Sequence, residues 1–293
     1  MRILFVSLFF TSFLFAGNGF ISVNELQQKL HDKNLVILDV TDEATYKQGH
    51  ILNAVLTDVS KFRKKEGSFE VMSDYSDVQR LLRTLGINDD SQIVIYGHGK
   101  KKELNKESYL ALVLIIHGAK NVSILNGGYL AWTFQSSLLS STDTVRPKDG
   151  NITVSYNPDI LVNMNYVKNR IGKVVMLDAR PPELYYGITL SKGVKRPGHI
   201  KGAVSSFWQD KFLKDETLRN DKELKEIFLN GYDLNSSDEV ISYCTGGMQA
   251  SMNWYILYSY FGFKNAKLYD ASLREWGNEK DTPMVRFKWE TFK

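Results

Sequence analysis

Short apolar runs alternate with stretches of helical character along most of this 293-residue chain. Residues 35–40 read LVILDV and residues 174–179 read VVMLDA, so each run closes beside an aspartate. Apolar runs of this length are typical of strands buried on both faces of a parallel sheet. Helical stretches follow the runs at 78–84, 107–117, 221–229 and 250–261. The alternation predicts an α/β fold, in which helices cover both faces of a mostly parallel sheet.

The chain also repeats itself. Each apolar run is followed by three further segments that match between the two halves. These pairs are 49–54 with 198–203, 93–96 with 240–243, and 124–132 with 268–276. Matches that keep their order and nearly constant spacing indicate two copies of one module.

The repeat sets the domain boundaries that we predict. The first domain spans 21–135 and the second spans 158–285. Residues 136–157 are rich in Ser, Thr and Asp and contain helix-breaking proline and glycine, so we expect a polar linker there. Residues 286–293 would form a C-terminal tail.

The N-terminus has the pattern of an export signal. Arg2 precedes an apolar run at 3–15, and the small residues Ala16 and Gly17 follow it. The run has the length of a secretory signal and is shorter than the roughly 20 residues that cross a bilayer. We therefore expect residues 1–17 to be a signal peptide, and the mature protein to be exported to the periplasm without an integral membrane span. The alternative is an uncleaved membrane anchor.

Composition mainly excludes classes of protein. Apolar residues make up 43% of the chain and charged residues 24%, an ordinary globular mixture that excludes a disordered or low-complexity protein. The net charge is +4, and the basic patches at 61–65 and 100–102 are small for a nucleic-acid-binding face. We expect no nucleic-acid partner, and we interpret both patches as solvated loops.

One cysteine, Cys244, is present. A disulfide within the chain and a cysteine-cluster metal site are therefore excluded. The five histidines show no paired spacing, so we expect no metal and no other cofactor.

The two modules differ where one matched strand ends. Gly97 follows the strand at 93–96, whereas Cys244 follows the strand at 240–243 and precedes a glycine-bearing loop and a helix. Backbone N–H groups of such a loop can form a nest for an anion, and the helix N-terminus adds partial positive charge. Both favour thiolate over thiol, which makes Cys244 the predicted nucleophile rather than an inert buried cysteine. The predicted active-site loop consists of Thr245, Gly246, Gly247, Met248, Gln249 and Ala250.

Together these segments resemble the rhodanese superfamily, specifically its two-domain sulfurtransferases of the thiosulfate and 3-mercaptopyruvate type. The resemblance rests on 196–203, the Cys244 loop and 268–276. It implies tandem rhodanese-like domains with a non-catalytic first and a catalytic second domain. It also implies that Cys244 takes a sulfane sulfur from a small donor, forms a persulfide, and passes the sulfur to a thiol or cyanide without a cofactor.

The loop leaves the sulfur donor open. Family members that prefer thiosulfate often carry a basic residue in the loop, whereas residues 245–249 are uncharged here. Members that use mercaptopyruvate have neutral loops, but one of their donor-binding arginines is replaced by Leu184. Thiosulfate is the conventional donor, and mercaptopyruvate and polysulfide stay alternatives. A non-enzymatic carrier, in which Cys244 holds persulfide for a partner protein, is the alternative from another class.

Further residues near the cysteine also match the family. Arg180 either contacts the substrate or forms a structural ion pair, and Asp178 is expected to accept hydrogen bonds that fix the loop. The histidines of the Gly-His-Ile segments, His50 and His199, are expected to be structural. Cysteine-dependent phosphatases of this fold carry an arginine six residues after the cysteine, where this chain has Ala250. Without that guanidinium the phosphate oxygens lack a bidentate partner, which argues against a phosphatase.

Overall fold

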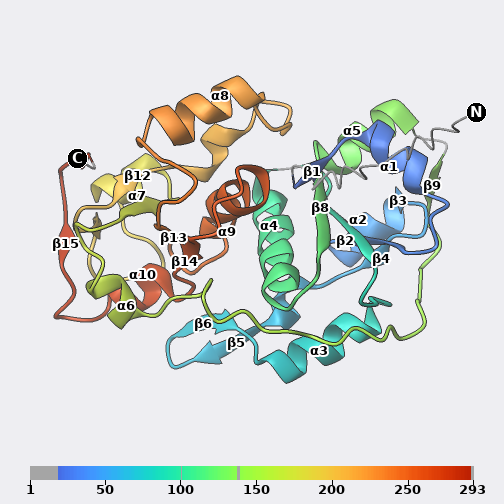
Figure 1. Cartoon of the computed structure of the whole chain (residues 1–293), viewed down its shortest axis with the longest axis horizontal. Coiled ribbons are helices and arrows are strands. Elements are labelled where there is room, and N and C mark those ends of the chain that lie inside the picture. The colour runs from blue at the N-terminus through green and yellow to red at the C-terminus, as the bar shows by residue number, and fades with distance from the viewer. Residues whose placement is uncertain (1–18, 100, 137–138, 292–293) are drawn as a thin grey trace, which may run out of the picture.

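The computed structural model describes residues 19–99, 101–136 and 139–291. The predicted signal peptide, 1–17, lies outside the described residues. Within them, the chain forms a five-stranded and a four-stranded parallel sheet, one in each half (Figure 1). The predicted tandem α/β architecture is confirmed.

The sheet of the first domain has the order β1-β8-β7-β2-β4, with all neighbours parallel. Its strands are β1 (Phe20–Ile21), β2 (Leu35–Asp39), β4 (Val55–Leu56), β7 (Gln92–Tyr96) and β8 (Asn121–Leu125). Its helices are α1 (Val23–Lys29), α2 (Glu43–Gln48), the 3₁₀ helix η1 (Val59–Phe62), α3 (Tyr75–Thr84), α4 (Lys101–Ile116) and α5 (Gly128–Ser136). A hairpin of β5 (Arg63–Glu66) and β6 (Phe69–Met72) follows η1 directly.

The sheet of the second domain has the order β12-β10-β13-β14. Its strands are β10 (Val175–Asp178), β12 (Val204–Ser205), β13 (Val240–Tyr243) and β14 (Ala266–Leu268). Its helices are α6 (Met164–Lys168), α7 (Pro182–Tyr186), the 3₁₀ helix η3 (Trp208–Lys211), α8 (Asp221–Lys225), α9 (Ala250–Tyr255) and α10 (Ser272–Trp276). Helix α8 continues as the π-helical turn η4 (Glu226–Asn230), and α9 continues as η5 (Ile256–Tyr260).

The Gly-His-Ile segments have the same packing role in both domains. Their histidines lie in β3 (His50–Ile51), which pairs with β9 (Ser140–Ser141), and in β11 (His199–Ile200), which pairs with β15 (Met284–Val285). Each imidazole Nδ1 lies 2.9 Å from the carbonyl oxygen of a tyrosine, and each ring stacks on that tyrosine. Both histidines are fully buried, as expected of structural residues.

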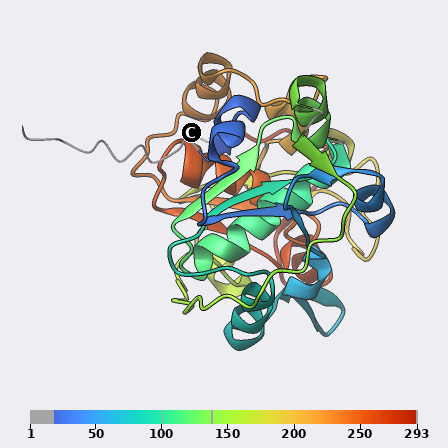
Figure 2. The ribbon, with the colours of Figure 1, turned by 90° about the vertical axis from the view of Figure 1, so that its right-hand side faces the viewer.

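The two domains pack through α4 and α9, which lie side by side at the centre of the molecule (Figure 1). The hydroxyl oxygens of Ser108 on α4 and Ser251 on α9 are 2.7 Å apart, and both serines are buried. In the view turned by 90°, the first domain lies in front and α4 crosses the middle of the molecule (Figure 2). The helix that follows Cys244 therefore packs directly against the first domain.

The expected linker and tail pack on the domains. Ile152 donates its backbone N–H to Ile87 of the first domain (3.1 Å), and Asn157 donates to Ile116 (2.8 Å). In the tail, Trp289 stacks on Tyr185, with ring centroids 5.1 Å apart. The boundaries 136–157 and 286–293 stay predictions. No helix in the described ranges is long and apolar enough to cross a bilayer.

Candidate active site

Cys244 lies where β13 ends, between its parallel neighbours β10 and β14. The residue is 2% exposed, and its backbone is fixed from both sides. Its N–H donates to the Ser272 hydroxyl (3.0 Å), and its carbonyl accepts from the N–H of Leu273 (3.2 Å). Ser272 donates in turn to the carbonyl of Tyr269 (2.7 Å). The first turn of α10 therefore holds the cysteine at the carboxyl edge of the sheet, where ligands of open α/β sheets bind.

The loop after Cys244 needs glycine at one position in particular. Gly247 has φ +84°, and a Cβ built there would lie 2.0 Å from Oδ1 of the buried Asp270. Any side chain would therefore strain the backbone and clash with that carboxylate. The loop therefore packs closely against Asp270, which follows β14.

The loop also has free backbone donors. Within the part of the chain that the structure describes, no group accepts a hydrogen bond from the N–H of Thr245, Gly246, Gly247 or Gln249. Unpaired N–H groups in a curled loop are the donors that bind an anion. This arrangement is consistent with the nest expected from the sequence.

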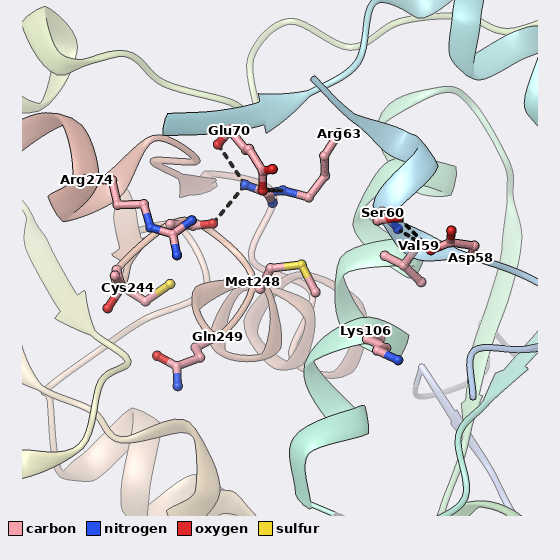
Figure 3. A pocket seen from close by; sticks show the side chains of 12 residues that line it. Asp58, Val59, Ser60, Arg63, Glu70, Lys106, Cys244, Met248, Gln249 and Arg274 are labelled. Carbon is pink, nitrogen blue, oxygen red and sulfur yellow. Dashed lines mark hydrogen bonds and ion pairs between the residues drawn. The ribbon is translucent and has the colours of Figure 1, made fainter. Parts of the chain in front are cut away.

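Cys244 lies on the wall of a cavity of about 440 Å³ that both domains line (Figure 3). Thr245, Gly246, Met248 and Gln249 of the predicted loop line it with the cysteine, whereas Gly247 and Ala250 are not among its lining residues. The remaining lining residues are Asp58, Val59, Ser60, Arg63, Glu70, Lys106 and Arg274. The first domain thus supplies half of the wall, including two of its three cations.

Arg63 is a site residue that the sequence interpretation missed. Its side chain is 6% exposed, and its Nη2 donates to the carbonyl of Gly246 in the cysteine loop (3.0 Å) and to that of Glu70 (2.7 Å). The expectation of a solvated patch at 61–65 is therefore wrong for Arg63, because β5 turns this side chain inward while Lys64 and Lys65 stay exposed. The one signal in the sequence is the apolar Phe62 beside it, which is buried.

A buried carboxylate connects Arg63 to the back of the loop. Asp270, after β14, accepts hydrogen bonds from the N–H of Met72 (2.6 Å) and the hydroxyl of Tyr109 (3.1 Å), and it pairs with Arg63 (3.5 Å). Burial raises the pKa of Asp270, and the Arg63 guanidinium opposes that rise. All three partners belong to the first domain, so contacts between the domains support Asp270 and, through it, Gly247.

Arg180 and Asp178 form a buried pair beside the sheet rather than part of the cavity wall. Arg180 Nη2 lies 2.6 Å from Asp178 Oδ2, and the same nitrogen donates to the carbonyl of Gly198 (2.8 Å). The expectation that Asp178 fixes the cysteine loop is wrong, because in the described ranges its carboxylate accepts from Arg180 and Tyr243 and from none of residues 245–250. The geometry favours the structural role of Arg180, and direct substrate contact stays a prediction.

The second domain has about ten residues more than the first within 184–197, an insertion whose charged residues we expect in a solvated loop. None of these charged residues lines the cavity. Lys192 and Lys195 are exposed, as expected for a solvated loop. Arg196 donates to backbone carbonyls that include those of Trp276 (2.7 Å) and Thr282 (2.8 Å). This arginine therefore fastens the insertion to the end of α10.

The equivalent loop of the first domain has a different occupant. Gly97 stands at the position of Cys244, and its N–H donates to the carboxylate of Glu107, which is buried. Glycine has no nucleophilic side chain, and its N–H is already hydrogen-bonded to a carboxylate. The predicted nucleophile therefore belongs to the second domain, and the matching loop of the first domain has none.

A buried cysteine between a parallel strand and a helix, in a loop with free N–H groups, defines a class of cysteine-dependent α/β proteins. The family model for the rhodanese-like domain matches residues 22–135 and 163–279, so the chain belongs to the rhodanese family, as a tandem of two such domains. The thiosulfate sulfurtransferase of Corynebacterium glutamicum is 28% identical over 288 residues, covering 92% of this chain and 90% of that protein.

Solved structures share the fold. SseA from Escherichia coli, described as a 3-mercaptopyruvate sulfotransferase, matches with a TM-score of 0.74 and 24% identity, over 87% of this chain and 98% of that one. YnjE matches with a TM-score of 0.78 and 18% identity, over 93% of this chain and 69% of that one. The chain thus has the fold of both structures. The family model and the sulfurtransferase relatives that cover about 90% of the chain make it an enzyme of the rhodanese type.

Proposed function

We propose that this protein is an exported sulfurtransferase that carries sulfane sulfur from thiosulfate, through a persulfide on Cys244, to a thiol or cyanide. The position of Cys244 carries the proposal, because its sulfur lies on the wall of a cavity that three cationic side chains also line. Two carboxylates, Asp58 and Glu70, line the same wall, so its formal balance is one positive charge, which favours entry of the thiosulfate dianion. The similarity to a protein named thiosulfate sulfurtransferase supports the same donor.

The reaction needs two displacements. The Cys244 thiolate attacks the outer sulfur of thiosulfate, so that a new S–S bond forms, the old S–S bond breaks, and sulfite leaves with the electron pair. A thiolate or cyanide then attacks the outer sulfur of the persulfide, and Cys244 leaves as the thiolate. The acceptor becomes a persulfide or thiocyanate, and neither step requires an oxidant.

The loop stabilises the anionic sulfur in both steps. The free N–H groups of residues 245–247 and 249 provide donors for the thiolate before transfer and for the persulfide after it. Because they belong to a loop braced by Gly247 and Asp270, they are already oriented before the donor arrives. Such preorganised donors lower the barrier without a cost of reorientation during the reaction.

The cavity favours an enzyme over a protein-bound sulfur carrier. Cys244 is 2% exposed, so an acceptor must enter the cavity to reach its sulfur. A small thiol or cyanide can do so, whereas the folded surface of a partner protein would need an extended segment. Mercaptopyruvate stays the second candidate donor because its carboxylate would meet the same cations.

Export is supported by the N-terminal pattern of Arg2, the apolar run at 3–15 and the small residues that follow. Fractionation of cells that produce the full chain, with mass spectrometry of the mature N-terminus, tests it. Cleavage after residue 16 or 17 and recovery outside the cytoplasm are expected. An intact N-terminus on a cytoplasmic protein contradicts export and leaves the enzymatic proposal untouched.

Steady-state kinetics test the enzymatic proposal. Double-reciprocal plots at several thiosulfate and cyanide concentrations should give parallel lines, because sulfite leaves before cyanide reacts. A single loading without turnover would support the carrier instead.

A further inference from the structure

We infer that Arg274 binds the oxyanion end of the sulfur donor, and so supplies from α10 the charge that the uncharged cysteine loop lacks. The inference rests on the proposed sulfur transfer and adds the residue that selects an anionic donor.

The position of Arg274 is fixed relative to Cys244. Its backbone N–H donates to the carbonyl of Thr245 (2.9 Å). This hydrogen bond lies next to the one that the N–H of Leu273 donates to the carbonyl of Cys244. Its side chain then runs over the loop, since a Cβ at Gly246 would lie 3.4 Å from both Cδ and Nη1 of the arginine. Figure 3 shows the guanidinium extending over the loop on the side where the Cys244 sulfur enters the cavity.

Among the three cations of the cavity wall, Arg274 is the one with all of its side-chain donors open to a ligand in the described ranges. Arg63 donates to carbonyl and carboxylate partners, whereas Lys106, on α4 of the first domain, uses one of its three N–H donors on the carbonyl of Val40 (3.3 Å). In the described ranges, the Arg274 side chain makes neither a hydrogen bond nor an ion pair. A half-buried guanidinium with open donors beside the nucleophile is suited to a ligand rather than to the fold.

The chemistry of the donor matches this side chain. A guanidinium presents a planar fork of N–H donors, which fits two oxygens of one oxyanion. In thiosulfate these oxygens belong to the group that leaves as sulfite, so Arg274 stabilises the charge that grows there while the outer sulfur reaches Cys244.

Alkylation of Cys244 separates anion binding from sulfur transfer. Iodoacetate and iodoacetamide both place a CH₂ group on the sulfur and release iodide, but only iodoacetate carries a carboxylate. In the full-length protein, Arg274→Met should lower the ratio of the iodoacetate rate to the iodoacetamide rate about tenfold, the loss expected for one charge-assisted hydrogen bond. Arg274→Lys should restore part of the ratio. Arg80→Met, which removes an exposed arginine on α3 that pairs with Asp77, should leave it unchanged.

The same variants are then measured with thiosulfate. Arg274→Met should lower kcat/KM for thiosulfate about tenfold, because both donor binding and the departure of sulfite lose the guanidinium. An unchanged ratio would overturn the inference. If both alkylation rates fall equally, so that their ratio stays the same, Arg274 only shapes the loop. A lower ratio in a protein that transfers no sulfur from thiosulfate would keep the anion site and refute the proposed function.

Discussion

Arg63 of the first domain and Asp270 of the second form an ion pair across the domain interface, with 3.5 Å between Nη1 and Oδ1. Both side chains are 6% exposed, and the same guanidinium donates to the carbonyl of Gly246 in the loop that follows Cys244. The first domain has no cysteine of its own, yet it holds the loop of the second in place. The first domain therefore contributes to the site although it has no cysteine.

Arg63→Met should lower both stability and activity. The substitution leaves Asp270 buried with one partner fewer, and removing one member of a buried pair costs about 3–5 kcal/mol. Urea unfolding should show this loss, and kcat/KM for thiosulfate should fall, with partial recovery in Arg63→Lys. Lys64→Met on the same strand is the control, because Lys64 is 42% exposed and pairs with the exposed Asp74. Equal behaviour of the Arg63 and Lys64 variants would refute the role of the pair.

Gly247→Ala should disrupt the cysteine loop. The added methyl group would meet the Asp270 carboxylate at 2.0 Å on a backbone with φ +84°. Backbone strain and overpacking together should cost about 2–4 kcal/mol. Sulfur transfer should fall more than tenfold.

Gly262→Ala is the matched control for that experiment. Gly262 also has a positive φ, +77°, but a Cβ there would have no atom within 4 Å. It should show the backbone cost alone, about 1 kcal/mol, with unchanged activity of the folded protein. If both alanine variants behave alike, the contact with Asp270 does not shape the loop.

Asp178→Asn should destabilise the second domain without changing donor selectivity. The substitution weakens the buried pair with Arg180, whose guanidinium also holds the carbonyl of Gly198. The expected loss on unfolding is about 3 kcal/mol, with a KM for thiosulfate near that of the wild type. A raised KM without a loss of stability would instead support substrate contact through Arg180.

Lys211 should make stability depend on pH. Burial lowers the pKa of Lys211 to about 7, while its Nζ donates to Ser206 (3.0 Å) and to the carbonyl of Phe207 (2.8 Å). The unfolded chain keeps an ordinary lysine pKa near 10.4, so it binds the extra proton between pH 7 and pH 10. The contribution of this residue to stability therefore rises with pH across that window.

Urea unfolding of the wild type and of Lys211→Met at pH 7 and pH 9.5 tests this dependence. The stability of the Met variant relative to the wild type should fall as the pH rises. A difference that does not change with pH would show that Lys211 titrates normally.

The sequence predicted the framework well because periodicity and repetition are local signals. The strand expected at 240–243 coincides with β13, and the helix expected at 250–261 covers α9 and η5. Cys244 was found because the two copies differ at that one strand end. The loop residues followed from their place after it.

The surroundings of the cysteine were harder to predict. Arg63 and Asp270 are 207 residues apart, and only the packing of one domain on the other brings them together. Arg274 belongs to a segment that served to detect the repeat, and nothing local marks its side chain as free. Asp178 was expected to bind the cysteine loop, but Arg180, two residues away, donates to its carboxylate instead.

Intact mass spectrometry of the purified protein is the most direct test of the account. The wild type and Cys244→Ser are incubated separately with thiosulfate, mercaptopyruvate and polysulfide. The account predicts that thiosulfate adds the mass of one sulfur atom to the wild type, that cyanide removes it, and that Cys244→Ser gains nothing. No addition from any donor, or an addition that persists in Cys244→Ser, would contradict transfer through a Cys244 persulfide.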